Sequence, residues 1–257
     1  MLSESSIEPA LREIAAWKIF DANVRVGRSG MHGQLALEAP ELLAEMDRFG
    51  IERALVAHFA AEEYDAAEGN RALAGAVREA PGRFEPAWAT LPDAASIDAL
   101  ASLRPAAVRL SFGVHQHNFS AARWCSGALF EYLEAHNVLA VVERQAIAWE
   151  SLDALLSDFP RLKVLLIETG YRADRNLRPL LRRHANLHFD SSTFLAHRQL
   201  EAFVEQCGPD RLVFGSRLPL YTPGAALAVL ASARVSDEAR LAVAGGTLRR
   251  LIGGERE

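Results

Sequence analysis

The sequence predicts an α/β protein: a single (β/α)8 barrel, or TIM barrel, with extra C-terminal helices. Short apolar runs alternate with longer helical segments along all 257 residues. Eight strand–helix units follow one another, and this strict alternation indicates a parallel sheet. An α/β barrel takes about 250 residues, so one domain over residues 1–257 accounts for the chain.

The expected strands are mostly unbroken apolar runs, as parallel strands are when both of their faces are buried. They span residues 17–26, 51–57, 84–89, 107–112, 138–142, 163–167, 187–190 and 212–214. An open doubly wound sheet is the alternative, but residues 27–30 (GRSG) do not fit its phosphate-binding glycine pattern.

Proline and glycine mark the ends of the first expected helix, where Pro40 lies near its start and Gly50 stops it. Asn137 is expected to end a later helix in a left-handed conformation. Ser236 and Thr247 are the expected N-caps of the last two helices. The helices are expected within residues 40–50, 70–80, 96–103, 128–136, 149–159, 177–183, 200–207, 225–233, 237–244 and 248–252.

Charge and cysteine content limit the partners and the compartment. A net charge of −5 and a pI near 5.9 disfavour nucleic acid and anionic membranes as partners. The N-terminus, MLSESSIEPALREIAAW, has no apolar run suited to a signal peptide, and no segment approaches the ~20 apolar residues of a membrane span. Cys125 and Cys207 are expected to be free thiols, which points to the cytoplasm.

Six segments spread over nearly the whole chain resemble the amidohydrolase-related family, which includes the aminocarboxymuconate-semialdehyde decarboxylases. They are IFDANVRVG, NRALAGAVREAPGRFEPAWATLPD, LEAHNVLAVVERQ, FPRLKVLLIETGY, DRLVFGSRLPLYTPG and SDEARLAVAGGTLRRLI. The resemblance implies a barrel that acts on small molecules, and it makes a homodimer plausible.

The resemblance also implies one divalent metal at the barrel mouth, but this sequence departs from the family at each ligand position. Asn23 and Arg25 replace the His-x-His after the first strand, and Glu143, Glu168 and Arg217 follow later strands. Arginine has no free lone pair to offer a metal. We therefore expect neither a family-type metal nor another cofactor.

The same five residues should meet at the barrel mouth. We expect Arg25 and Arg217 to pair with Glu143 and Glu168, because a buried charge persists only when it is compensated. In a functional interpretation, the arginines and Asn23 bind an anionic substrate while the glutamates act as general acid and base. In a structural one, the four charges only hold the barrel top together.

Four further residues are candidates for the site. Arg109 either adds to an anion site or points outward from its strand. His117 is a candidate catalytic base, and His115 and Tyr221 are candidate substrate contacts. Alternatively, the two histidines are surface residues and Tyr221 has a packing role.

Three functions stay open at this point. The first is a metal-independent hydrolase or decarboxylase that acts on a small carboxylated or cyclic substrate. The second is a catalytically inactive barrel with a binding or scaffolding role. The third is a metal-dependent hydrolase with a different metal site, built from His58, His115 and His117 with Glu143 and Glu168.

Overall fold

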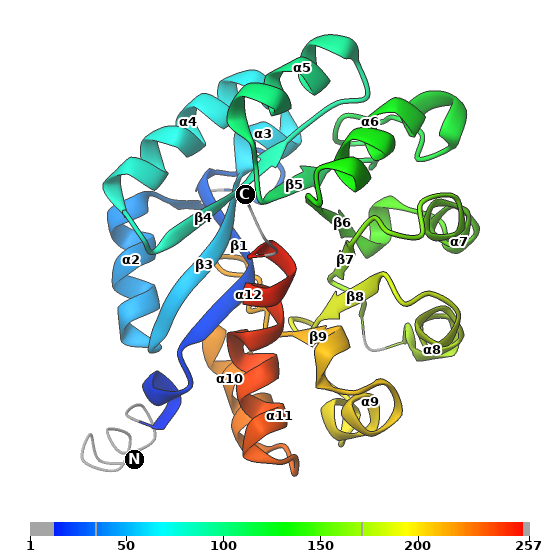
Figure 1. Cartoon of the computed structure of the whole chain (residues 1–257). Helices are drawn as coiled ribbons and strands as arrows, with labels where there is room; N and C mark the ends of the chain where they lie inside the picture. The colour runs from blue at the N-terminus through cyan, green and yellow to red at the C-terminus, as the bar shows by residue number, and fades with distance from the viewer. Residues whose placement is uncertain (1–12, 34, 171, 254–257) are drawn as a thin grey trace.

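Parallel strands curl into a closed barrel with helices around the outside, as Figure 1 shows. The computed structural model describes residues 13–33, 35–170 and 172–253. Within these residues the sheet order is β2-β1-β3-β4-β5-β6-β7-β8-β9. The parallel strands are β1 (Ile19–Arg28), β3 (Ile51–His58), β4 (Phe84–Ala89), β5 (Ala107–Leu110), β6 (Leu139–Glu143), β7 (Val164–Ile167), β8 (Leu187–Asp190) and β9 (Leu212–Val213).

The barrel closes where β1 meets the chain that continues from β9. Ala22 N donates to Phe214 O at 2.9 Å, and Arg25 N donates to Leu218 O at 2.9 Å. Val24 and Leu218 also form a parallel bridge. The first and last strands therefore share one seam, and the predicted (β/α)8 barrel is confirmed.

Apolar strands build the core from both of their faces. Every residue of β7 is buried, and so are the first four residues of β6. One set of side chains packs under the surrounding helices and the other fills the barrel interior. Continuous apolar runs in the sequence follow from this two-sided burial.

The helices pack around the barrel at the positions that the sequence predicts, with small shifts of their ends. Their bounds are α2 (Ala39–Arg48), α3 (Phe59–Glu63), α4 (Ala66–Glu79), α5 (Ala94–Leu103), α6 (Arg123–Ala135), α7 (Trp149–Asp158), α8 (Asp174–Arg183), α9 (Gln199–Cys207), α10 (Pro223–Ser232), α11 (Asp237–Leu241) and α12 (Thr247–Ile252). Asn137 has the expected positive φ of 55°, and Gly50 has one of 69°.

Local details at three places differ from the prediction. The short strand β2 (Ala36–Leu37) pairs antiparallel with the end of β1, and α3 follows β3 directly. Ser236 caps α11 as predicted, by accepting from Ala239 N. Thr247 is not a cap, because a π-helical turn, η3 (Ala242–Gly246), continues straight into α12 and its hydroxyl donates to Pro209 O instead.

Residues 1–12, on which the expectation about a signal peptide depends, lie outside the described residues. In the described part of the chain, no helix combines the length and apolar character needed to cross a bilayer.

Candidate functional site

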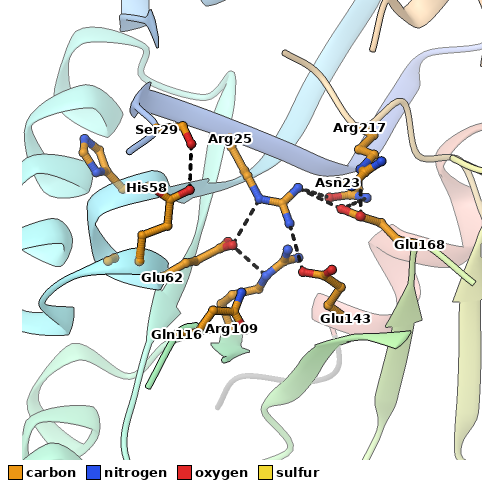
Figure 2. A network of polar contacts seen from close by, with 12 residues as sticks. Asn23, Arg25, Ser29, His58, Glu62, Arg109, Gln116, Glu143, Glu168 and Arg217 are labelled. Carbon is orange, nitrogen blue, oxygen red and sulfur yellow. Dashed lines mark hydrogen bonds and ion pairs between the residues drawn. The ribbon is translucent and has the colours of Figure 1, made fainter. Parts of the chain in front are cut away.

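Charged side chains from several strands meet at the C-terminal end of the barrel, where the βα loops begin (Figure 2). Arg25 lies on β1 and Arg109 on β5, while Glu143 ends β6. Glu168 directly follows β7, and Arg217 follows β9. Parallel strands bring these ends together at one mouth, so the predicted convergence of the site residues is found.

Arg25 lies at the centre of this charge network and is only 4% exposed. Its Nε donates to Glu62 Oε2 at 3.1 Å, and its Nη1 donates to Glu168 Oε1 at 2.9 Å. Its Nη2 lies 3.7 Å from Glu143 Oε2, and Nη1 also donates to Asn23 Oδ1 at 3.2 Å. The predicted pairing of Arg25 with both glutamates is confirmed.

Glu62 is a member of the network that the sequence analysis missed. It lies on α3, whose first turn is capped by His58 Nδ1, which accepts from Ala60 N at 3.1 Å. Glu62 is buried, and its two oxygens face Arg25 and Arg109. The available signal was its place just after a predicted strand, in a loop of the kind that carries barrel active sites.

Arg109 points into the mouth, so the outward orientation considered for it is wrong. Its Nε lies 3.0 Å from Glu62 Oε1, at ion-pair distance but outside hydrogen-bond geometry. Its Nη2 is buried, and no described residue accepts a hydrogen bond from it. A buried guanidinium donor without an acceptor is rare in folded proteins and indicates a place for a further acceptor.

Glu168 and Arg217 both have left-handed backbone conformations, with φ of 57° and 64°. Their side chains meet at 2.7 Å between Arg217 Nε and Glu168 Oε2, which confirms the predicted pair. Arg217 also stacks over the Tyr221 ring, 4.8 Å from its centroid. Positive φ is uncommon outside glycine and costs of order 1–3 kcal/mol, so the surrounding contacts hold both residues in place.

Two buried aspartates accept hydrogen bonds from Asn23 and from the backbone next to the network. Asp190 accepts from the backbone N of Glu168 at 2.9 Å and from Asn23 Nδ2 at 3.2 Å. Asp21 Oδ1 accepts from the backbone N of Asn23 and of Ser216, each at 3.0 Å. Burial raises the pKa of Asp21 to about 7 and that of Asp190 to about 6. Asn23 therefore connects the network to two carboxyl groups that titrate near neutral pH.

The two glutamates named from the sequence have opposite pKa shifts. Burial raises the pKa of Glu143, and the nearby Glu168 carboxylate raises it further, against the effect of Arg25. Burial also acts on Glu168, but the Arg25 and Arg217 guanidiniums outweigh it and hold its pKa below the usual range. Two carboxyl groups with separated pKa values are the arrangement that acid–base chemistry uses.

A cavity of about 340 Å³ opens beside the network. Small-molecule sites typically measure about 300–1,000 Å³. Its lining includes Arg25, Glu62, Glu143, Arg217 and the exposed His115. The network therefore faces a space that a small molecule can enter.

The remaining candidates lie around this cavity without lining it. His117 Nε2 donates to Ala61 O at 2.7 Å, which ties its loop to α3. Tyr221 is half-exposed and contacts Arg217 from the side. The structure thus brings His115 to the cavity and leaves His117 and Tyr221 at its edge.

The donor set at the mouth does not fit the divalent metal that the resemblance implies. Arg25 and Arg217, which the sequence analysis expects at ligand positions, both pair with Glu168 at the mouth, and a guanidinium only donates hydrogen bonds. Among residues 13–33, 35–170 and 172–253, no group of three or more His, Cys, Asp or Glu side chains is arranged to hold a metal ion. The alternative site built on His58, His115 and His117 is therefore not assembled there.

Comparisons with known proteins identify relatives at the level of family and fold. A family model described as Amidohydrolase matches residues 28–254. No curated protein matches the chain.

Solved structures match over nearly their whole length. An uncharacterized TIM-barrel protein, Bb4693 from Bordetella bronchiseptica, is 16% identical with a TM-score of 0.76, covering 91% of this chain and 98% of its own. The 5-carboxyvanillate decarboxylase LigW from Sphingomonas paucimobilis is 17% identical with a TM-score of 0.74, covering 92% and 99%. A putative 2-pyrone-4,6-dicarboxylic acid hydrolase from Pseudomonas putida is 17% identical with a TM-score of 0.71, covering 94% and 99%.

Proposed function

The chain belongs to the amidohydrolase family, and on that premise we propose that it is a metal-independent enzyme of small carboxylated ring compounds. Decarboxylation is the reaction that the site supports best, and hydrolysis of a cyclic ester is the alternative within the same class. The observation that carries the proposal is the cavity, which is bordered both by an arginine–glutamate network and by Glu143, a carboxyl group whose pKa burial raises.

Substrate recognition is assigned to the guanidinium groups at the mouth. Arg217 lines the cavity with its side chain 20% exposed, and the buried Arg25 also lines it. Guanidinium groups bind carboxylates by paired, charge-assisted hydrogen bonds. The names of two similar structures, 5-carboxyvanillate decarboxylase and 2-pyrone-4,6-dicarboxylic acid hydrolase, both specify a ring that bears carboxyl groups.

Proton transfer is assigned to Glu143. Burial and the Glu168 carboxylate raise the pKa of Glu143, which favours the protonated form that a general acid requires. In decarboxylation, the Glu143 proton adds to the ring carbon that bears the carboxylate. The bond from that carbon to the carboxylate then breaks, CO₂ leaves with its oxygens, and the bonding pair restores the ring. Solvent returns the proton to Glu143.

Metal independence is part of the proposal, and the positions of Arg25 and Arg217 support it. A metal ion beside two guanidiniums would be repelled, and the carboxylates that could bind it are already paired. In this scheme the guanidiniums supply the positive charge that a metal would supply in relatives.

Two measurements test the proposal. Protein purified without chelators is analysed for zinc, iron and manganese by inductively coupled plasma mass spectrometry, and substoichiometric metal is expected. Hydroxybenzoates and pyrone carboxylates are then screened for CO₂ release or ring opening, with Glu143→Gln expected to lower the rate at least 100-fold. Stoichiometric metal whose removal abolishes turnover would refute metal independence.

A binding protein without catalysis is the second candidate, and the extensive pairing of Arg25 favours it. Three carboxylates already surround that guanidinium. This candidate predicts that the same compounds raise Tm without being converted, and that Glu143→Gln leaves their affinity intact.

A further inference from the structure

The arginine charges of the network are balanced by its glutamates only when all three glutamates are ionised. Three guanidiniums, from Arg25, Arg109 and Arg217, face three carboxylates. The carboxylates come from Glu62, Glu143 and Glu168. An anion that enters the cavity in this state meets a network of no net charge with a carboxylate at the wall.

The three carboxylates are held very unequally. Glu62 contacts two guanidiniums at 3.1 and 3.0 Å, and Glu168 contacts two at 2.9 and 2.7 Å. Among the residues that the structure describes, Glu143 has one ion-pair contact, to Arg25 at 3.7 Å. Its side chain is 21% exposed, whereas those of Glu62 and Glu168 are 3% and 2% exposed. Protonation therefore costs least at Glu143, which is also the carboxylate nearest to solvent through the cavity.

Protonation of Glu143 would leave one positive charge of the network uncompensated. That charge is shared by the groups that face Glu143: Arg25 on β1 and Arg109 on β5. Arg109 does not line the cavity, but its Nη2 is buried with no acceptor among the described residues, so the network holds an unused donor next to the partners of Glu143. An unmatched guanidinium charge and an unused donor together suit a carboxylate ligand.

We propose that the cavity binds a monoanionic ligand together with one proton, and that Glu143 carries this proton. The inference rests on the proposed binding of a carboxylated substrate and adds how that binding depends on pH. Glu143 thus determines specificity, because a neutral ring compound would gain nothing from its protonation. The bound state already holds the proton that the proposed decarboxylation consumes.

The direction of the shifts agrees with this assignment. Burial and the Glu168 carboxylate raise the pKa of Glu143, whereas the arginines keep Glu168 ionised. The other titratable groups on the cavity wall are His32, His115 and Glu63, of which Glu63 accepts from Ser29 Oγ and Gly30 N. These two histidines, and the buried Asp21 and Asp190 next to the network, are the rival proton carriers that an experiment has to separate from Glu143.

The test measures the affinity of the intact protein for benzoate by calorimetry between pH 5 and 9. In the wild type, Kd should rise about tenfold per pH unit above the pKa of Glu143, since one proton is linked to binding. Measurements in two buffers of different ionisation enthalpy should show uptake of one proton in that range. Glu143→Gln should remove the slope and bind at least tenfold more tightly than the wild type at pH 9.

Glu150→Gln, the same change at an exposed position of α7, is the matched control and should keep the wild-type slope. A slope that persists in Glu143→Gln would assign the proton to a histidine or to one of the two buried aspartates and overturn the inference, while the proposed function stands. Binding of benzoate without any pH dependence would overturn it in the same way. Absence of benzoate binding at every pH would instead refute the anion site itself. If Glu143→Gln fails to fold, His32→Gln and His115→Gln are titrated instead, and loss of the slope in either variant would overturn the inference.

Discussion

Arg25→Ala removes the one guanidinium that, among the described residues, contacts all three glutamates of the charge network. In Arg25→Ala, Glu62 keeps Arg109 and Glu168 keeps Arg217, but Glu143 loses its single ion-pair contact. Breaking a buried ion pair from one side typically costs about 3–5 kcal/mol. Because two of the three carboxylates keep a partner, we expect a loss near the lower limit, about 3 kcal/mol at pH 8.

The loss should depend on pH in a defined direction. Burial already raises the pKa of Glu143 in the folded protein, and loss of the opposing Arg25 guanidinium should raise it further. A raised folded pKa stabilises at low pH, and this stabilisation is lost as pH rises through it. The destabilisation by Arg25→Ala should therefore be smaller at pH 5.5 than at pH 8.

Urea unfolding followed by circular dichroism measures the loss of unfolding free energy at each of the two pH values. In a thermal melt at pH 8, the expected fall in Tm is roughly 6–12 °C. Arg161→Ala is the matched control, because the Arg161–Glu134 pair has its arginine side chain 80% exposed. Exposed pairs contribute about 0–1 kcal/mol. An Arg25→Ala loss no larger than that of Arg161→Ala, or one that is independent of pH, would refute the view that the network is electrostatically coupled.

Three further substitutions test separate parts of the structure. Burial raises the pKa of Asp21 from 3.8 to about 7, so the wild type should lose stability across that range as pH rises, and Asp21→Asn should flatten this slope in urea titrations at pH 5 and 8. Gly215→Ala would place a Cβ 2.4 Å from Asp190 Oδ2 and should lower the free energy of unfolding by about 1–3 kcal/mol. Gly75→Ala, which has open space around it, is the control and should cause no loss. Equal Tm values for the two variants would contradict the packing argument. Ser236→Ala removes the cap of α11 and should lower the free energy of unfolding by about 1 kcal/mol. An unchanged free energy of unfolding would contradict this role of Ser236.

The barrel could be predicted from the sequence because its signals are local and repeated. Each parallel strand is an apolar run, and Gly50 and Asn137 mark helix ends by a backbone conformation that few other residues adopt. Strand β2 could not be predicted, because two residues carry no periodicity. Thr247 was misassigned as a cap, since a hydroxyl before an apolar run looks the same whether or not the preceding chain is already helical.

The residues of the candidate site that lie at or just after the ends of strands could be predicted from the sequence. Asn23, Arg25, Glu143 and Arg217 follow from their positions along the chain, and the structure places them at one mouth. Glu62 could not be singled out, because Glu62 and Glu63 are adjacent on a five-residue helix. Only the rotation of α3 about its axis decides that Glu62 meets the arginines while Glu63 accepts from Ser29 and Gly30.

The seam between β1 and the chain after β9 has a consequence for the order of folding. Ser216 N donates to Asp21 Oδ1 across 195 residues of sequence. Arg25, the central residue of the charge network, lies on the same strand as Asp21. Such distant contacts close late, after the entropy of the intervening chain has been lost. The proposed binding site is therefore complete only in the closed barrel, and a ligand of that site should recognise only the closed form. Saturating ligand should then slow the opening of the seam, which amide hydrogen exchange at residues 22 and 25 would report.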